Sequence, residues 1–316
     1  MPIKPLTLFT LSMIMTACAT SSISRPVIFS EQHKIGDIHK EIRLRGTIEL
    51  ANHKINGLKL TELSGLAWDE DEAVLYAISD KGYLFHLRPS IQQNTLIALT
   101  PLSAYRLQTK LTKDSEGLAI LNGDNGVAGD SELVISFEGK PQIARFTPKG
   151  KRLSDYTLPS VLQNIENYYK PNKALEAVTV HPHIGIITAP EWPLKSQNAV
   201  DGQHKHKLYT LDGKHWTFPA YPAPNSAIVA LEALEDGSIL ILERAFSSVF
   251  QPVIISLRQL WLSGNHRFIA VFDSSQGWEV DNFEGLTHHR GKYFFMVSDD
   301  NENSLQRTLL SYWEII

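Results

Sequence analysis

The chain has 316 residues, of which 43% are hydrophobic and 20% are charged, and its formal net charge is −4. Proteins that bind nucleic acids present clustered positive charge. Because this sequence has no basic stretch, we exclude a nucleic-acid partner. The length allows either two ordinary domains or one large repeat domain.

The N-terminus has the pattern of an export signal. A basic residue, Lys4, precedes a mostly apolar run over 6–15, which is too short to span a bilayer as a helix. Small residues then precede Cys18, as in a bacterial lipobox. We therefore expect 1–18 to be a lipoprotein signal peptide with a lipidated Cys18, and an ordinary signal peptide is the alternative. Ala19 after the cysteine is typical of an outer-membrane address, so we expect an envelope protein whose only membrane contact is this anchor.

Residues 19–40 are polar and aperiodic, which predicts a flexible tether, and 41–316 are expected to form the folded domain. Cys18 is the only cysteine, so disulfides and thiolate chemistry are excluded from this domain. Only 160–169 has a weak helical pattern. Short strand-like runs separated by turn formers predict an all-β chain; they include 41–50, 75–78, 133–137, 185–189, 239–242, 253–257, 268–272, 293–297 and 309–314.

A repeat of about 55 residues runs through the domain. In each repeat a Glu followed by small and apolar residues opens a strand, at Glu62, Glu116, Glu176, Glu232 and Glu284. A second polar cluster then ends an apolar strand, at Asp80, Glu138, Glu191, Glu243-Arg244 and Asp299-Asp300-Asn301. This period suits a four-stranded propeller blade with its loops.

The repeat predicts a β-propeller of five blades, with six as an alternative. The last repeat, 284–316, is too short for four strands, so we expect the run 41–60 to complete its blade and close the ring. A β-sandwich is the other architecture open to an all-β chain. It gives no reason for five evenly spaced acidic motifs.

Equivalent positions of successive blades converge on the propeller axis, which would bring the acidic residues together. Like charges at about 4 Å repel by roughly 4 kcal/mol at an effective dielectric of 20, so such a ring calls for protons, cations or metal. Calcium accepts six to eight oxygen ligands in loose geometry. We therefore expect Ca²⁺ at one mouth, held by Glu62, Asp80, Glu116, Glu176, Glu284 and Asp299. For the four Glu residues the alternative is that their carboxylates cap turn amides between blades, and for Asp80 and Asp299 it is a solvated loop at the end of a strand. Glu232 is a weaker candidate, since Glu235 and Asp236 near it predict a hairpin turn.

The ends of the second strands supply candidate substrate-binding residues. Arg244 stands directly after Glu243, and a guanidinium can hold an anionic group bidentately. A solvated loop is the alternative for all of these polar positions. The candidates are Glu138, Glu191, Glu243, Arg244, Asp300 and Asn301.

Several of these segments resemble the phytase-like family of bacterial propellers, described as having esterase-like activity of phytase. The resemblance covers roughly residues 45–316 and is most specific at the C-terminal end. It is carried by Glu62-Leu-Ser-Gly-Leu-Ala-Trp68, Leu75-Tyr-Ala-Ile-Ser-Asp80, Asp114-Ser-Glu-Gly-Leu-Ala119, Leu242-Glu-Arg-Ala-Phe246, Asp281-Asn-Phe-Glu-Gly-Leu286, Val297-Ser-Asp-Asp-Asn301 and Gln306-Arg-Thr308. It implies an exported propeller that hydrolyses phosphate or other esters.

The chain departs from the calcium-dependent propeller phytases in one respect. It lacks the dense Lys and Arg set that would hold a highly phosphorylated inositol; near the expected mouth we find only Lys81, Arg244 and Arg307. Phytate is therefore not the expected substrate.

Three functions follow from these observations. The first is a monomeric, calcium-dependent hydrolase of a small anionic or ester substrate, with Glu116, Glu176 and Glu284 as metal ligands or general base and Arg244 stabilising negative charge. The second is a non-catalytic binding module of the envelope with structural calcium. The third is a lactonase-like propeller.

Overall fold

The structure is a computed structural model, and it describes residues 23–109, 114–197, 204–248 and 250–316. The predicted signal peptide and Cys18 lie outside the described residues. Among the described helices, none has the length and apolar character needed to cross a lipid bilayer.

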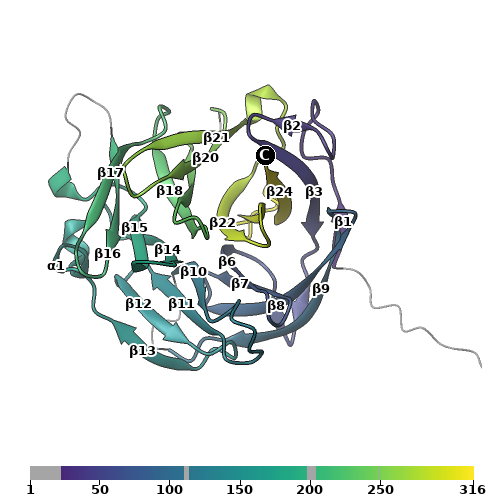
Figure 1. The fold of residues 1–316 in the computed structure, drawn as a ribbon. Helices are drawn as coiled ribbons and strands as arrows, with labels where there is room; N and C mark the ends of the chain where they lie inside the picture. The colour runs from purple at the N-terminus through teal and green to yellow at the C-terminus, as the bar shows by residue number, and fades with distance from the viewer. Residues whose placement is uncertain (1–22, 110–113, 198–203, 249) are drawn as a thin grey trace, which may run out of the picture.

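Five antiparallel sheets are arranged around a central axis as a five-bladed β-propeller (Figure 1). Each of the first four blades is built from four consecutive strands. Their bounds are β6 (Leu63–Asp69), β7 (Val74–Ser79), β8 (Tyr83–Gln92) and β9 (Thr95–Arg106); β10 (Ser115–Leu121), β11 (Glu132–Phe137), β12 (Gln142–Phe146) and β13 (Arg152–Tyr156); β14 (Leu175–His181), β15 (Gly185–Pro190), β16 (Lys205–Thr210) and β17 (His215–Pro219); and β18 (Ser226–Ala233), β19 (Ile239–Ala245), β20 (Ile254–Leu260) and β21 (His266–Asp273).

The fifth blade joins the two ends of the chain. Its inner strands are β22 (Asn282–His288), β23 (Tyr293–Asp299) and β24 (Leu309–Ile315), and β24 pairs antiparallel with β3 (Ile42–Leu50). The expected closure of the ring by the N-terminal run is thus what the strand pairing shows. A small hairpin, β4 (Lys54–Ile55) and β5 (Leu58–Lys59), leads from β3 to the first blade.

Part of the predicted tether belongs to the fold. The strands β1 (Ser24–Pro26) and β2 (Ile38–His39) both pair with β3. Ile23 and Phe29 are buried, and Phe29 packs edge-on against Trp278 and Trp313. The tether prediction for 19–40 is therefore wrong from residue 23 onward, because single apolar anchors in a polar stretch leave no periodic pattern.

Among the residues that the structure describes, helical structure occurs only as short pieces in the loops. The weak helical pattern at 160–169 corresponds to α1 (Ser160–Gln163) and the 3-10 turn η1 (Ile165–Asn167). Two further 3-10 turns are η2 (Lys195–Gln197) and η3 (Ser274–Gln276).

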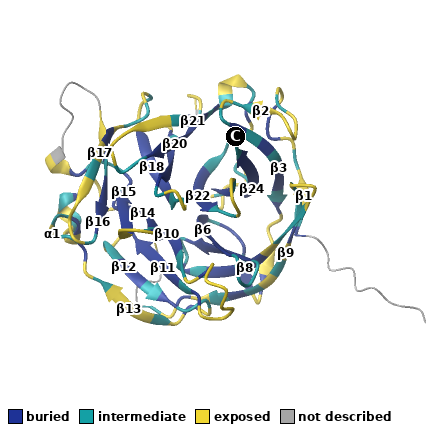
Figure 2. Ribbon diagram, viewed as in Figure 1, coloured by how far each residue is buried: buried dark blue, intermediate teal, exposed yellow. Residues whose placement is uncertain are grey.

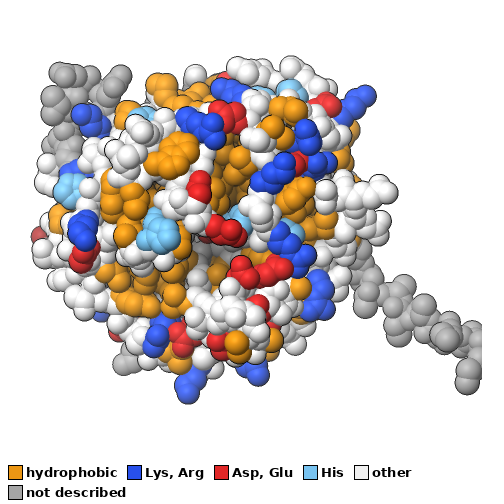
Figure 3. Space-filling model, viewed as in Figure 1, with side chains coloured by type: hydrophobic (Ala, Val, Ile, Leu, Met, Phe, Trp, Pro, Cys, Tyr) orange, Lys and Arg blue, Asp and Glu red, His pale blue; other side chains and the backbone are white. Residues whose placement is uncertain are grey.

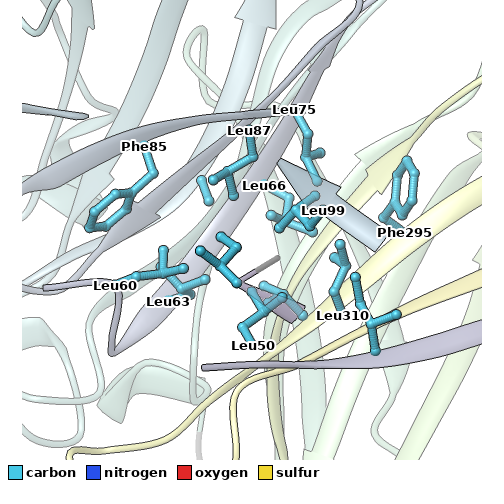
Figure 4. Packing of buried hydrophobic residues seen from close by; sticks show 14 of the residues in the cluster. Leu50, Leu60, Leu63, Leu66, Leu75, Phe85, Leu87, Leu99, Phe295 and Leu310 are labelled. Atoms are coloured by element: carbon cyan, nitrogen blue, oxygen red, sulfur yellow. The ribbon is translucent and has the colours of Figure 1, made fainter. Parts of the chain in front are cut away.

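Burial follows the position of each strand within its blade (Figure 2). Every residue of the inner strand β6 is buried, since it packs on neighbouring blades on both faces, whereas the outermost strand β13 is exposed or half-buried. The hydrophobic core consists of five clusters, one at each junction between blades. Figure 4 shows the cluster at the ring closure, where Leu50 of β3 and Leu310 of β24 meet Leu63 and Leu66 of β6.

The inner strands approach one another too closely for a side chain at two positions. A Cβ added to Gly117 would lie 2.6 Å from the backbone N of Val178 in the next blade, and one added to Gly65 would lie 2.7 Å from the carbonyl oxygen of Glu116. The glycine of the Glu-Gly-Leu motif is thus explained by the packing of neighbouring inner strands.

Candidate functional site

A β-bulge near the start of every inner strand positions the acidic motif. The register between the first and second strands shifts at the same point in all five blades, for example between Ser115 and Leu118 and between Phe283 and Gly285. Bulges commonly re-aim a side chain beside an active site. Aligning the blades on this bulge gives one ring of equivalent residues: Ser64, Glu116, Glu176, Val229 and Glu284.

This alignment corrects two members of the sequence repeat. Glu62 precedes the equivalent position, Ser64, by two residues, and Glu232 follows the equivalent position, Val229, by three. The sequence repeat could not reveal either misassignment, because its interval varies from 52 to 60 residues with the lengths of the loops, and a shift of two or three residues falls within that range. Only Glu116, Glu176 and Glu284 form the predicted ring.

A second ring comes from the ends of the second strands. The residues after β7, β11 and β15 are Asp80, Glu138 and Glu191, and in β23 the equivalent residue is Asp299. In the fourth blade the equivalent residue is Arg244, since it pairs in register with Ala227 as Asp299 does with Asn282. The mouth therefore holds seven carboxylates and one guanidinium in these two rings.

The two rings line a cavity of about 820 Å³ at one mouth of the propeller. It is lined by Glu116, Glu176 and Glu284 together with the whole second ring, by Asn282 at the start of β22, and by loop residues that include Lys173, Asp281, Asn301 and Arg307. Figure 3 shows one face of the molecule, on which Asp and Glu side chains gather near the centre and Lys and Arg side chains lie mainly farther out.

Three carboxylates of the cavity are close enough to share a cation. One oxygen from each of Glu138, Glu176 and Glu191 lies within 4.8 Å of the others, and all three residues are buried. Glu138 accepts a hydrogen bond from the amide of Ala174 at 3.0 Å. Within the part of the chain that the structure describes, the carboxylate of Glu176 receives no hydrogen bond, so it is free to bind a ligand.

Burial and the repulsion between neighbouring carboxylates raise the pKa values of the acids in this part of the cavity. Burial raises the pKa of Glu176 well above its ordinary value, and Glu191 and Glu138 raise it further. For Glu116 the causes are burial and then the charges of Asp80 and Glu176. Burial and Glu191 raise the pKa of Glu138 to about 7. Without a cation, these groups therefore retain protons at a pH where ordinary carboxyls have lost them.

A second group of acids lies on the side of the first and fifth blades. Burial, Glu284 and Asp299 raise the pKa of Asp80 to about 9, and burial and Glu284 raise that of Asp299 to about 8. The Oδ1 atom of Asp80 is buried and has no hydrogen-bond partner among the described residues. Asn282 donates hydrogen bonds to Glu284 at 2.9 Å and to Asp299 at 3.2 Å, which ties these two carboxylates together.

Arg244 lies between the two groups of acids. Its Nη1 donates to Glu284 Oε1 and to Asn282 Oδ1, and its Nη2 lies 3.4 Å from Glu191 Oε1. Burial opposes the charge of Arg244, but Glu284 and Glu191 outweigh it and raise its pKa. Lys173 forms a second ion pair with Glu191, at 2.6 Å.

Three predicted site residues do not line this cavity. The carboxylate of Glu62 instead forms an ion pair with Lys81 at 2.6 Å. The Oδ1 atom of Asp300 accepts hydrogen bonds from Thr61 at 2.5 Å and from the amide of Glu62 at 3.0 Å, so this side chain fastens the loop after β23 to the first blade. Asp300 thus caps an amide of the neighbouring blade, whereas the carboxylate of Glu62 forms an ion pair and caps no amide among the described residues.

Glu243 is the third, and it points into the blade. Its carboxylate binds Arg258, with Arg258 Nε 2.9 Å from Glu243 Oε2, and both side chains are completely buried. The guanidinium of Arg258 also lies over the rings of Phe218 and Phe268. Because neighbouring residues of a strand face opposite sides, Arg244 faces the cavity and Glu243 cannot.

Among the cavity residues that were not predicted as site residues are three polar ones near the starts of inner strands. Asn282 and Asp281 stand directly before the Glu284 motif, and Lys173 stands shortly before the Glu176 motif. Their position at or just before the start of an inner strand is the sequence feature that could have identified these three residues as part of the site. Asp281 holds this entry together, accepting from the amide of Arg307 at 2.8 Å.

Glu232 serves the opposite end of the channel. It accepts a hydrogen bond from the amide of His288 in the next blade at 2.8 Å. Thr179 and Thr287, at the equivalent positions, accept from the amides of Ala233 and Trp68 in the same way. Glu232 is thus one of three fasteners between inner strands, within a smaller cavity of about 200 Å³.

Comparison with known proteins identifies the family. Residues 59–302, more than half of the chain, match the model of the phytase-like family, described as "Esterase-like activity of phytase". The chain belongs to this family. The match spans all five inner strands and ends just beyond the second-ring residue Asp299, so both rings of the site lie within the phytase-like region.

Beyond its family, this phytase-like protein resembles solved structures at low sequence identity. Among solved structures it is similar to a gluconolactonase from Xanthomonas campestris, with 12% identity and a TM-score of 0.42, over 90% of this chain and 99% of that chain. No curated protein matches the sequence. The membership of the phytase-like family supports a hydrolase-type function.

Proposed function

We propose that this protein is a calcium-dependent hydrolase of a phosphoester or a related ester, and that it acts at the acid-lined mouth. The observation that carries the proposal is the convergence of Glu138, Glu176 and Glu191 within 4.8 Å inside a cavity of about 820 Å³. Membership of the phytase-like family agrees with a hydrolase.

The residues present fit a hard divalent cation. The three carboxylates offer only oxygen donors, which calcium prefers, and the unpartnered carboxylate of Glu176 makes one ligand available without breaking another bond. Buried carboxylates that repel one another are stabilised by a cation. When bound, calcium supplies positive charge that polarises an ester oxygen and orients a water.

Residues of the chain supply the remaining functions. Arg244 lies beside the triad, and its guanidinium can donate hydrogen bonds to an oxygen on which negative charge develops. Glu116 faces the same cavity, and its pKa is raised by burial and then by Asp80. A raised pKa is the property that a carboxyl needs to exchange a proton efficiently near neutral pH, so we assign Glu116 the role of proton carrier.

The reaction that these roles support is addition of water across an ester bond. The oxygen of the water bonds to the acyl carbon or the phosphorus, and the bond from that atom to the alcohol oxygen breaks. One proton of the water is taken up by a carboxylate, and the alcohol oxygen receives a proton as it leaves.

The test combines calcium binding with turnover. Calorimetric titration of the purified protein with calcium is expected to show binding, and Glu176→Gln is expected to weaken it. Hydrolysis of p-nitrophenyl phosphate and p-nitrophenyl acetate is compared in calcium and in EDTA. Turnover of at least one ester that EDTA abolishes supports the proposal; no turnover under any metal condition refutes it.

One observation favours a second function, a non-catalytic binding module with structural calcium. The cations of the cavity are already engaged: Arg244 with Glu284 and Glu191, and Lys173 with Glu191. In this case Glu284→Gln lowers only the calcium-dependent melting temperature, whereas in a hydrolase it abolishes turnover.

We further propose that the protein is a monomer held at the outer membrane by a lipid on Cys18. This proposal rests on the lipobox pattern and on the polar residues that follow it. Cell fractionation of wild type and Cys18→Ala tests the anchor: the wild type is expected with the membranes and the variant in the soluble fraction.

A further inference from the structure

The large cavity has two walls of different chemistry. The second and third blades contribute the acidic triad Glu138, Glu176 and Glu191. A second wall, which we call the apolar wall, comes from the loops of the fourth and fifth blades; it carries Phe246, Val253, Val280 and Leu305 beside polar lining residues such as Gln251 and Gln306.

The apolar wall includes side chains that water surrounds in the free protein. Phe246 is 44% exposed and Leu305 is 88% exposed. Phe250, in the same loop as Phe246, is 90% exposed. Val253 and Val280 pack against the core cluster between the fourth and fifth blades and give this wall a fixed base. Large apolar side chains that are exposed together at a cavity mark a binding surface.

The charges of the cavity disfavour a strongly anionic ligand. Its described lining includes eight carboxylates: Asp80, Glu116, Glu138, Glu176, Glu191, Asp281, Glu284 and Asp299. The cations among the described lining residues are Lys173, Arg244 and Arg307, and each is paired with a carboxylate, the last with Glu279 at 3.0 Å. One calcium ion at the triad would offset only part of the charge of eight carboxylates, so a ligand with several negative charges would still meet repulsion and no unpaired cation among the described lining residues.

We infer that the substrate is an uncharged carboxylic ester with an apolar chain of several carbons, which contacts Phe246 and Leu305 while the ester group reaches the acidic wall. This inference rests on the proposed hydrolase function and narrows it from esters in general to this class. Transfer of each methylene from water to an apolar surface strengthens binding by roughly fourfold when burial is complete. The affinity of the apolar wall for a substrate should therefore increase with the length of the substrate's apolar chain.

The experiment varies chain length and the wall together. Values of kcat/KM are measured in calcium for p-nitrophenyl acetate, butyrate and octanoate. Binding of octyl glucoside, an uncharged amphiphile without an ester, is measured separately by calorimetry below its micelle concentration. The variant is Phe246→Ser combined with Leu305→Ser. Because both side chains are substantially exposed, the substitutions are not expected to disturb folding, which circular dichroism checks. Val127→Ser, at a 53% exposed valine far along the chain from this wall, is the matched control.

The wild type is expected to prefer octanoate over acetate by about tenfold or more, since six added methylenes gain partial burial. In the double variant this ratio falls at least fivefold and octyl glucoside binding weakens to a similar degree, while Val127→Ser keeps both. Equal kcat/KM values for the three esters would overturn the inference, and so would an octanoate-to-acetate ratio that the double variant does not change. Either result would still be consistent with the proposed hydrolase function. Octyl glucoside binding that depends on the wall, without turnover of any ester, supports the apolar subsite and refutes the hydrolase.

Discussion

Arg244 and Glu191 occupy equivalent positions in neighbouring blades, and Arg244 Nη2 lies 3.4 Å from Glu191 Oε1. One blade thus supplies a cation where the other four supply a carboxylate. A ring of five acids would attract cations equally at every blade. The single guanidinium gives the mouth one place where negative charge can be stabilised beside a cation site. The fourth blade also lacks the inner acid, since Val229 replaces it.

The first prediction concerns the metal triad. Glu176→Gln is expected to weaken calcium binding at least roughly tenfold, because calcium affinity depends on the number of charged ligands. Titration calorimetry measures the Kd. Glu235→Gln, the same substitution in an exposed turn, is the control and should leave the Kd unchanged. Equal Kd values for wild type and Glu176→Gln would exclude this triad as the calcium site.

The second prediction concerns pH. In the folded, metal-free protein the pKa values of Asp80, Asp299 and Glu138 are raised to about 9, 8 and 7. The folded state then binds more protons than the unfolded state, whose carboxyls titrate near pH 4. The contribution of these three protonated carboxyls to the free energy of unfolding is present in full below about pH 4 and is lost as the pH rises through 7 to 9. We expect the free energy of unfolding in EDTA to fall by on the order of a few kcal/mol between pH 5 and pH 9.

Urea denaturation at a series of pH values measures this loss. Asp80→Asn cannot ionise at this position, so its profile should be flatter than that of the wild type. Calcium competes with protons for the same oxygens and should therefore stabilise the protein more at pH 8 than at pH 5. A metal-free stability that rises over this range would contradict the prediction.

The third prediction concerns Arg244. Arg244→Gln leaves Glu284 and Glu191 without their buried cation, and the loss of one partner of a buried pair costs about 3–5 kcal/mol. We expect that loss of stability in EDTA. Calcium should bind the variant more tightly, because a positive charge beside the ligands is gone.

Arg25→Gln is the control, since Arg25 pairs with Glu49 at the surface and is 73% exposed. It should cost less than about 1 kcal/mol. If Arg244→Gln keeps its stability and binds calcium more weakly, the ion pairs described for Arg244 do not operate in solution.

The fourth prediction separates Glu243 from the site. Glu243→Gln leaves the fully buried Arg258 without its carboxylate and should destabilise the protein by about 3–5 kcal/mol. The double variant Glu243→Leu with Arg258→Met removes both charges and should recover most of that loss. Neither should change the Kd for calcium, since Glu243 does not line the cavity. A higher Kd for calcium in folded Glu243→Gln would contradict this prediction and indicate that Glu243 belongs to the site.

The repeat itself could be predicted from the sequence. The spacing of the Glu-Gly-Leu motifs, the short apolar strands and the truncated last repeat led to a five-bladed propeller closed by the N-terminal run, as the sheet order shows. These features depend on local composition and on the chain length of one blade, which a sequence displays directly. Glu116, Glu176 and Glu284 were identified for the same reason.

The tertiary structure decided which residue of each repeat faces the axis. A shift of one position in a strand turns a side chain to the opposite face, so Glu243 and Arg244 could not be assigned from their order alone. The bulge common to all inner strands sets the true alignment, which places Ser64 and Val229, not Glu62 and Glu232, in the ring. The apolar wall beside the acids could not be seen in the sequence, because it is assembled from loops about 25 to 60 residues apart that the packing of the fourth blade on the fifth brings to one cavity.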